Sequence, residues 1–291
     1  MLHNLVIGTA NFGMPYGILA TGDSLPQSEI KNIIAQAFAN NITCFDTAFA
    51  YQHAIDSLLR HTQAQCLQNT IEVIVKFNAA EDLDRVYSQL ENILKQYNLA
   101  YFAAVLIHDP HYLPQVDKKK LATLLDKLLS TGITKKIGLS AYDFDDVKIM
   151  HKIFPISLVQ CPINPLNKSF LSEAVLDFFR ENTIEMHGRS LFLQGILLQD
   201  KLPEKLLGLT AEWQNFMNIV KSYNANPLLV ILKWAFSQAP VSKWVLGVSG
   251  AQDMKEIIAT IQSPHFNRVQ PNFPTSLLPQ NLLIDPRNWK F

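Results

Sequence analysis

The sequence predicts an α/β protein of the (β/α)8 class, the TIM barrel, in which eight parallel strands form a closed barrel inside a layer of helices. Short apolar runs rich in β-branched residues alternate along the chain with longer segments of helical period. Several of these runs are apolar at consecutive positions, as expected of parallel strands covered on both faces. Eight such alternations in one chain favour a closed barrel.

Eight segments have the length and composition of barrel strands. They are residues 5–9, 42–47, 71–77, 101–108, 135–140, 157–163, 184–192 and 244–249. An open doubly wound sheet is the alternative, and it normally carries a GxGxxG phosphate loop after its first strand. The first turn of this chain reads GTANFGMPYG instead. The turn therefore favours the barrel over the open sheet.

The segments between the strands carry apolar residues at steps of three and four, which places one apolar stripe on each predicted helix. Such stripes are Ile30, Ile33, Ile34, Ala37 and Phe38, then Leu83, Val86, Leu90, Ile93, Leu94 and Tyr97, and later Leu121, Leu124, Leu125, Leu128 and Leu129. Ser28, Asp143 and Asn226 are expected to begin helices, the last with Pro227 at the first helical position.

The chain has 291 residues and shows no convincing domain boundary. We expect residues 1–262 to form a single (β/α)8 domain, with an additional helical insertion within 196–225. Residues 263–291 are rich in proline and asparagine and are expected to form a tail that packs on the barrel. The tail has two possible positions, over the barrel mouth or along the side of the barrel.

Composition excludes several classes of function. The 25 basic and 25 acidic residues cancel, so no net field attracts nucleic acid or an anionic membrane. No apolar run approaches the ~20 residues of a membrane helix, and the start of the chain lacks the features of a signal peptide. Cys44, Cys66 and Cys161 have no metal-ligand spacing, and we expect them to be reduced. These features predict a cytoplasmic protein without a metal site.

Polar residues stand at the carboxyl ends of the otherwise apolar strands, where the active sites of such barrels lie. These residues are Asp46, Lys76, His108, Ser140, Gln160, Arg189 and Ser249. Tyr51 follows Asp46 by five residues, in the loop after the second strand.

Four of these side chains have complementary acid–base chemistry. A carbonyl that accepts hydride at carbon develops negative charge on oxygen and needs a proton donor, which the phenol of Tyr51 can be. A nearby ammonium, Lys76, is expected to lower the pKa of this phenol, and a carboxylate, Asp46, is expected to hold the ammonium. A neutral imidazole, His108, can orient the carbonyl oxygen and stabilise its charge.

The same residues carry a specific resemblance. The segment FDTAFAYQHAIDSLL resembles the DTAxxYG motif of the aldo-keto reductase superfamily, and the chain looks like one of its bacterial members. VIVKF and LIHDP are similar to the lysine and histidine strands of that family, and IGLSAYD and VQCPIN to its fifth and sixth strands. The match covers most of residues 4–262. It implies catalytic roles for Asp46, Tyr51, Lys76 and His108.

The resemblance also implies a nicotinamide cofactor. Ser140 and Gln160 match the positions that hydrogen-bond the carboxamide, and Gly8, Thr9 and Ala10 match a turn close to the nicotinamide. GRSLFLQGILL takes the place of the segment that wraps the pyrophosphate, and GVSGAQDMKEII resembles the last cofactor loop. The remaining cofactor-binding residues implied in these segments are Arg189, Ser190, Gln194, Gly247, Ser249 and Gln252.

The sequence departs from the family pattern at several positions. Ala141 stands where an asparagine usually binds the carboxamide, and Arg189 stands where an aromatic ring usually stacks on the nicotinamide. Gln52 replaces the glycine after the motif tyrosine. Asp253 replaces a basic residue that grips the 2′-phosphate of NADP(H) in relatives. We therefore expect NADP(H), the family default, with NAD(H) as a close alternative. The usual N-terminal hairpin has no room before the first strand.

These observations predict an oxidoreductase, a monomer, that reduces a small aldehyde or ketone to an alcohol, with Tyr51 as general acid. A sugar-derived carbonyl is one hypothesis for the substrate. Two alternatives stay open. One is a nicotinamide-binding regulatory subunit with little turnover. The other is a lyase or isomerase that uses Lys76 as a Schiff-base nucleophile.

Overall fold

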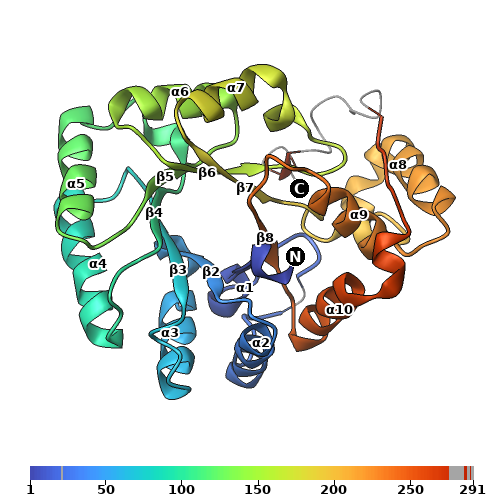
Figure 1. Cartoon of the computed structure of the whole chain (residues 1–291), viewed down its shortest axis with the longest axis horizontal. Coiled ribbons are helices and arrows are strands. Elements are labelled where there is room, and N and C mark those ends of the chain that lie inside the picture. The colour runs from blue at the N-terminus through green and yellow to red at the C-terminus, as the bar shows by residue number, and fades with distance from the viewer. Residues whose placement is uncertain (21, 275–284, 287–288, 290–291) are drawn as a thin grey trace.

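The computed structural model describes residues 1–20, 22–274, 285–286 and 289. Eight strands form a closed barrel in the order β1 to β8, and β8 closes the barrel by pairing with β1 (Figure 1). Every neighbouring pair is parallel. The predicted (β/α)8 barrel is confirmed.

All eight predicted strands are present, and each is shorter than predicted. They are β1 (Leu5–Gly8), β2 (Cys44–Ala48), β3 (Glu72–Phe77), β4 (Ala104–Ile107), β5 (Ile137–Ser140), β6 (Leu158–Pro162), β7 (Glu185–Arg189) and β8 (Lys243–Gly247). The segment 184–192 shows why the strands shorten. Ser190 has a φ of 58°, in the left-handed region, so the chain turns out of the sheet immediately after Arg189.

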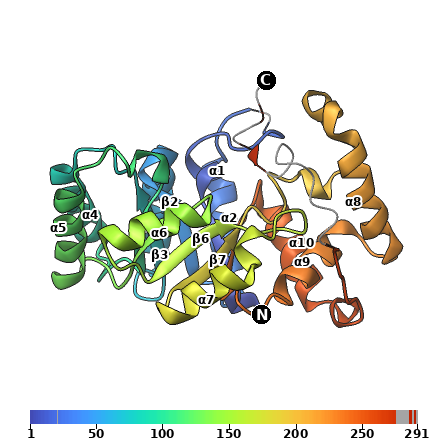
Figure 2. The same ribbon diagram turned by 90° about the horizontal axis from the view of Figure 1, so that it is seen from above.

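Helices surround this barrel on its outer side (Figure 1). They are α1 (Ala10–Gly13), α2 (Gln27–Ala39), α3 (Ala54–Ala64), α4 (Leu83–Tyr97), α5 (Lys118–Ser130), α6 (Phe144–Ile153), α7 (Glu173–Glu181), α8 (Thr210–Ser222), α9 (Pro227–Phe236) and α10 (Ala251–Gln262). Short 3-10 turns lie at η1 (Leu2–Asn4), η2 (Phe49–Tyr51), η3 (Pro110–Tyr112), η4 (Ser169–Leu171), η5 (Ile196–Leu198), η6 (Glu204–Leu209) and η7 (Pro264–Asn267). The helical insertion predicted within 196–225 is α8, which stands outside the ring of barrel helices (Figure 2).

Two of the three predicted helix starts are confirmed. The Asn226 side chain accepts a hydrogen bond of 2.7 Å from the Leu229 N–H at the start of α9, and Asp143 is the N-cap of α6. Ser28 as the start of α2 was wrong. This helix already begins at Gln27, because Pro26 supplies a fixed φ of −57° immediately before it.

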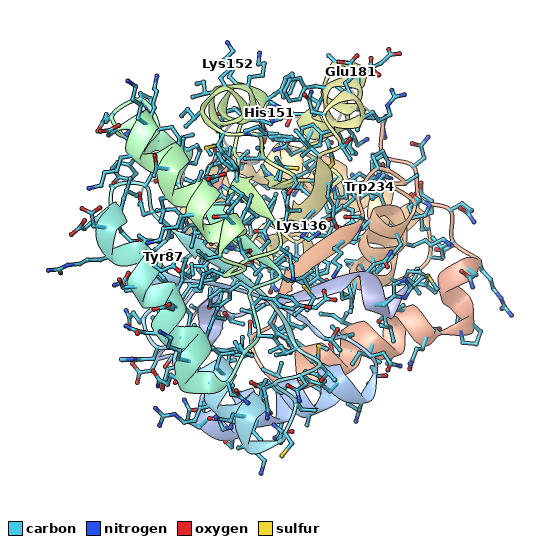
Figure 3. All side chains as sticks on the ribbon, turned by 60° about the vertical axis from the view of Figure 1, so that its left-hand side comes forward. Tyr87, Lys136, His151, Lys152, Glu181 and Trp234 are labelled. Atoms are coloured by element: carbon cyan, nitrogen blue, oxygen red, sulfur yellow. The ribbon has the colours of Figure 1, made fainter. Side chains whose placement is uncertain are left out.

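The apolar stripes of the helices pack on the outer face of the barrel and form one large core, except that Leu129, at the end of the stripe on α5, is exposed. Polar side chains remain on the solvent side, as Lys152 on α6 and Glu181 on α7 show at the rim of Figure 3. Tyr87 of α4 lies in the same view, and the Lys127 ammonium of α5 sits 3.7 Å from the centre of its ring. This contact joins two neighbouring helices outside the core.

The barrel interior is filled in layers. Its middle layer is a separate apolar cluster, formed by the inward-facing residues Val6, Cys44, Ile74, Ala104, Leu106 and Leu158. Above this layer, toward the carboxyl ends of the strands, the inward-facing residues become polar. The apolar layer therefore separates the two ends of the barrel from each other.

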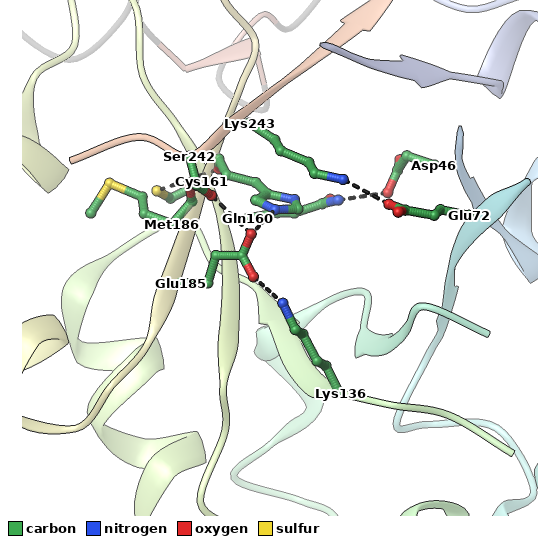
Figure 4. A network of polar contacts seen from close by, with 10 residues as sticks. Asp46, Glu72, Lys136, Gln160, Cys161, Glu185, Met186, Ser242 and Lys243 are labelled. Carbon is green, nitrogen blue, oxygen red and sulfur yellow. Dashed lines mark hydrogen bonds and ion pairs between the residues drawn. The ribbon is translucent and has the colours of Figure 1, made fainter. Parts of the chain in front are cut away.

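The lower end of the barrel carries a cluster of charges, which we call the bottom ion-pair cluster: Glu72, Lys136, Glu185 and Lys243. Each of these residues stands at or directly before the start of a strand. The Lys243 Nζ lies 2.7 Å from Glu72 Oε2, and Lys136 pairs with Glu185 (Figure 4). Ser242 Oγ donates to Glu185 Oε1 at 3.0 Å.

The described part of the tail packs against α8 and α9. Phe273 stacks on Phe216 of α8 with ring centres 5.5 Å apart and meets Trp234 of α9 edge-on at 6.2 Å. The Lys168 ammonium donates to the Phe273 carbonyl oxygen. Lys168 lies in the loop after β6, so its contact joins the tail to the carboxyl-terminal end of the barrel. Residues 275–284, 287–288 and 290–291, which include much of the predicted tail, lie outside the described residues.

We expect the bottom ion-pair cluster to stabilise the fold only while Glu185 is ionised. A hydrogen bond with His187 and the ammonium of Lys136 hold the pKa of Glu185 well below its usual value, against the opposing effect of burial. In the unfolded chain this pKa returns to about 4.3. The unfolded state therefore binds the proton first as the pH falls, and stability is lost progressively below about pH 5.

Urea unfolding of Glu185→Gln at pH 7 and pH 4 tests this expectation. The variant should be less stable than the parent at pH 7, and it should lose less stability on acidification. Glu181→Gln, which changes an exposed carboxylate at the end of α7, is the matched control. An equal acid dependence in parent and Glu185→Gln would contradict the role of this carboxylate.

Candidate active site

The centre of the site is a buried triangle of Asp46, Lys76 and Gln160, which project inward from β2, β3 and β6. Lys76 forms an ion pair with Asp46. The Gln160 Nε2 donates to Asp46 Oδ1 at 2.7 Å (Figure 4), and the Lys76 Nζ donates to Gln160 Oε1 at 3.3 Å. All three side chains are almost completely buried. Each member therefore has its charge or its hydrogen-bonding atoms satisfied by the other two.

Tyr51 and His108 lie beside this triangle. Tyr51 ends the turn η2 after β2, and His108 directly follows β4. Their rings meet edge to face, with centres 5.4 Å apart and planes at 87°. The Lys76 Nζ lies 5.5 Å from the centre of the Tyr51 ring. The structure thus brings together the four residues that the sequence singled out as an acid–base set.

The two rings are both uncharged at neutral pH. Burial, followed by the charges of Lys76 and Arg189, lowers the pKa of His108 to about 3. Burial, followed by the charge of Asp46, raises the pKa of Tyr51 above its usual value, while Arg189 opposes this effect. The expectation of a lowered pKa for Tyr51 was wrong. Desolvation of the phenolate and the charge of Asp46 outweigh the charge of Arg189 here.

The turn after β1 supports the backbone of Asp46. The Thr9 Oγ1 and the Thr9 N–H both donate to the Asp46 carbonyl oxygen, at 3.0 and 2.9 Å. Gly8 is paired with Asp46 in the sheet, and Ala10 begins α1. Of the predicted cofactor-binding residues, Gly8, Thr9 and Ala10 therefore lie next to the buried triangle.

Arg189, at the end of β7, spans the top of the barrel. Its Nη2 donates to the Ala141 carbonyl oxygen at 3.0 Å, and its Nη1 to Ser190 Oγ at 3.2 Å. The guanidinium carbon lies 4.3 Å from the centre of the Tyr142 ring, a stacking contact. The two departures from the family pattern at Ala141 and Arg189 are thus in direct contact with each other.

Of the other residues predicted to bind the carboxamide and phosphate, some already hydrogen-bond within the protein and one does not. Ser140 ends β5 beside Gln160, and no hydrogen-bond partner of its hydroxyl is found in the described part of the chain. The Gln160 amide already hydrogen-bonds Asp46 through its Nε2 and Lys76 through its Oε1. The Gln194 Oε1 accepts a 2.8 Å hydrogen bond from the Ile18 N–H, so this side chain fastens the loop that follows α1.

The loop between β8 and α10 holds two carboxylates. The Ser249 N–H donates to Asp253 Oδ2 at 2.8 Å, and the Ala251 N–H donates to Glu29 Oε2 of α2, also at 2.8 Å. Gly247 is exposed at the end of β8. The predicted cofactor residue Gln252 bonds Glu256 on the exposed face of α10 at 2.8 Å. The start of α10 is therefore occupied by the protein's own acids.

Gln52, at the position where the family has glycine, has a φ of 47° and a ψ of −111°. Glycine adopts positive φ at no steric cost, whereas the Cβ of glutamine makes this backbone conformation energetically unfavourable. The Gln52 side chain lines a surface groove of about 620 Å³ together with Phe49 and Tyr97. The strained residue thus directly follows Tyr51.

Two supporting residues were not recognised in the sequence. A Cβ at Gly13 would lie 1.9 Å from the Tyr51 carbonyl oxygen, so α1 passes directly against the turn that carries Tyr51. Glu29 reaches the start of α10 from 222 residues away in the chain. The glycine in GTANFG was a usable signal for a close approach. No sequence pattern marks Glu29.

Among the residues that the structure describes, no group of three or more His, Cys, Asp or Glu side chains is arranged to hold a metal ion. Likewise, within the described ranges, no helix has the length and apolarity required to span a membrane.

Comparisons with known proteins identify relatives of this chain. The profile of the Aldo/keto reductase family matches residues 4–269. "Probable aldo-keto reductase 1" of Glycine max is 30% identical over 156 residues, which cover 48% of this chain and 43% of that protein. The matched region thus spans less than half the length of this relative.

Solved structures show the same fold. Aldo-keto reductase AKR11C1 from Bacillus halodurans, in its holo form, superposes with a TM-score of 0.71 at 14% identity and covers 91% of each chain. Glycerol dehydrogenase AKR11B4 from Gluconobacter oxydans has a TM-score of 0.66 at 16% identity, with 93% of this chain and 95% of that chain covered. With the family profile extending over nearly all of the barrel, the chain belongs to the aldo/keto reductase family of oxidoreductases.

Proposed function

We propose that this enzyme reduces an aldehyde or ketone to an alcohol with a nicotinamide cofactor, and that Tyr51 is the proton donor. The observation that carries the proposal is the contact of three groups. A neutral phenol lies edge to face with a neutral imidazole and 5.5 Å from a lysine that a buried carboxylate holds in place. This arrangement suits a site where negative charge develops on oxygen.

The residues at the barrel mouth fit a nicotinamide cofactor. The Ser140 hydroxyl is available for the carboxamide, while Gln160 positions Lys76 and Asp46 rather than offering free donors. Ser190 and Gln194 stand in the loop after β7, where their backbones are left-handed, with φ values of 58° and 54°. When bound, the cofactor supplies hydride to the carbonyl carbon.

The protein's own groups handle the charge and the proton. Tyr51 holds its proton at neutral pH, because burial disfavours the phenolate. An alkoxide is a much stronger base than a phenolate, so a raised pKa of Tyr51 still allows the transfer. The neutral His108 keeps an N–H that can donate to the carbonyl oxygen. The Lys76 ammonium then stabilises the phenolate that remains on Tyr51.

The Schiff-base alternative is disfavoured by the contacts of Lys76. A nucleophilic lysine must present a free amine. The Lys76 ammonium is paired with Asp46 and donates to Gln160, and both contacts stabilise its charged form. The regulatory alternative predicts cofactor binding with little turnover, which steady-state kinetics distinguishes directly.

Replacement of the proposed proton donor should slow the catalytic step without weakening cofactor binding. We expect Tyr51→Phe to lower kcat by about 100- to 10,000-fold, because it deletes the proton donor. The affinity for reduced cofactor should not change, since the ring is retained. Stopped-flow single turnovers with a simple aldehyde and fluorescence titration of the cofactor measure the two effects. Tyr101→Phe, at an exposed tyrosine, is the control. Unchanged turnover in Tyr51→Phe would exclude this mechanism.

The acids at the start of α10 support NAD(H) as the preferred cofactor. The resemblance assigns this loop to the adenosine end of the cofactor, where NADP(H) carries an additional phosphate. Glu29 and Asp253 already accept hydrogen bonds from the backbone there. A phosphate would have to displace these carboxylates against like-charge repulsion, whereas a ribose hydroxyl can hydrogen-bond to them.

We therefore expect tighter binding of NADH than of NADPH. Glu29→Gln and Asp253→Asn should each move the ratio of the two dissociation constants toward NADPH, by about 2- to 5-fold. Titrations that follow quenching of tryptophan fluorescence give this ratio. Glu256→Gln makes the same change of charge one turn further along α10 and should leave the ratio unaltered. Equal effects of all three variants would refute a specific role for the two acids.

The close approach of α1 to the Tyr51 turn leads to a further expectation. A methyl group at position 13 meets the Tyr51 carbonyl and the Ala54 N–H, and both are backbone atoms that cannot rotate away. Gly13→Ala should lower the free energy of unfolding by about 1–3 kcal/mol. It should also lower kcat, by about 100-fold if Tyr51 shifts by an ångström. Gly208→Ala is the control, because open space surrounds Gly208. Full activity of Gly13→Ala would show that the turn adapts without moving Tyr51.

A further inference from the structure

Arg189 is held in place by neutral groups. Its guanidinium stacks on the Tyr142 ring and donates to a backbone carbonyl at Ala141 and to the Ser190 hydroxyl. The Tyr142 backbone is itself fixed, because its N–H donates to Asp146 Oδ2 at 3.1 Å. These contacts orient the guanidinium without neutralising its charge.

The charge of Arg189 has no acidic partner in the described part of the chain, where no carboxylate oxygen lies within 4 Å of the guanidinium. Its Nε–H is buried and has no acceptor among the described residues. Two of the five guanidinium N–H donors are used, which leaves three. A partly buried cation without a counter-ion is costly unless a ligand supplies the anion.

The position of Arg189 links this charge to the reaction. Arg189 lies close enough to Tyr51 and His108 to lower the pKa of both side chains. The charges of Asp46 and Lys76 cancel each other, and the two rings are neutral. Among these five residues, Arg189 therefore contributes the net charge, which is positive.

We propose that Arg189 binds an anionic group of the substrate, so that the preferred substrate is an aldehyde or ketone that also carries a carboxylate. The planar guanidinium offers adjacent N–H groups that match the two oxygens of a carboxylate. This inference rests on the proposed reductase function and adds the class of substrate to it.

Matched pairs of aldehydes test the proposal. Succinic semialdehyde and butanal share the aldehyde and the chain length, and differ in a carboxylate against a methyl group. D-glucuronate and D-glucose form a second pair. With saturating reduced cofactor, we expect kcat/KM of the parent enzyme to be at least about tenfold higher for the carboxylate of each pair.

Arg189→Met should abolish this preference. We expect kcat/KM for succinic semialdehyde to fall about 10- to 100-fold further than that for butanal, so that the ratio of the two values approaches one. Arg180→Met removes a surface arginine that is paired with Asp177, and it should change neither value. Arg189→Gln, which keeps hydrogen-bond donors without the charge, replaces the Met variant if the latter fails to fold.

A binding measurement distinguishes failure of the carboxylate proposal from failure of the proposed reductase function. The products 4-hydroxybutyrate and 1-butanol, titrated calorimetrically into the parent with oxidised cofactor, should differ in affinity only while Arg189 is present. Turnover of both aldehydes with equal kcat/KM would overturn the carboxylate assignment and leave the reductase function intact. No turnover of any aldehyde would refute the reductase function, and the titration alone would then decide on Arg189. If Arg189→Met changed only the relative affinities for oxidised and reduced cofactor, the guanidinium would serve the nicotinamide and the proposal would be wrong.

Discussion

The buried ion pair of Asp46 and Lys76 is the constraint on which the rest of the site depends. Two charges removed from water are stable only when each finds a partner of good geometry and the remaining polar atoms are satisfied. Gln160 completes this requirement by bonding both residues. Thr9 then fixes the backbone of Asp46. Tyr51 and His108 pack against a charge whose position is determined by these contacts.

The fold was readable from the sequence because the barrel produces a simple pattern. Each strand is covered by helices outside and by other strands' side chains inside, so it reads as a short apolar run. Polar residues such as Asp46 and Lys76 stand at the ends of these runs that meet at the barrel mouth, which made them visible as a set. Strand ends were less accurate, since they depend on local backbone geometry. The left-handed φ of Ser190, for example, leaves no trace in composition.

The features that could not be predicted depend on how deeply a side chain is buried and on contacts between residues far apart in the sequence. The pKa of Tyr51 is raised rather than lowered because the phenol is deeply buried, and a sequence motif does not reveal this burial. Glu29 and Ala251 meet because α2 and α10 are neighbours around the closed barrel. Glu72 and Lys243 are ordinary residues in the sequence, 171 positions apart, and become an ion pair only when the barrel closes.

The contacts at both ends of the barrel join the first half of the chain to the second. Gln160 of β6 bonds Asp46 of β2 at the upper end, and Lys243 of β8 bonds Glu72 of β3 at the lower end. A chain that has been synthesised only as far as β4 holds the ion pair of Asp46 and Lys76 without the amide that completes it, and Glu72 without its lysine. The first half-barrel on its own therefore lacks partners for polar groups at both of its ends. The catalytic centre is complete only once β6 has joined the first half-barrel, and the lower end of the barrel only once β8 has joined. A chain that ends before β6 therefore has no complete active site.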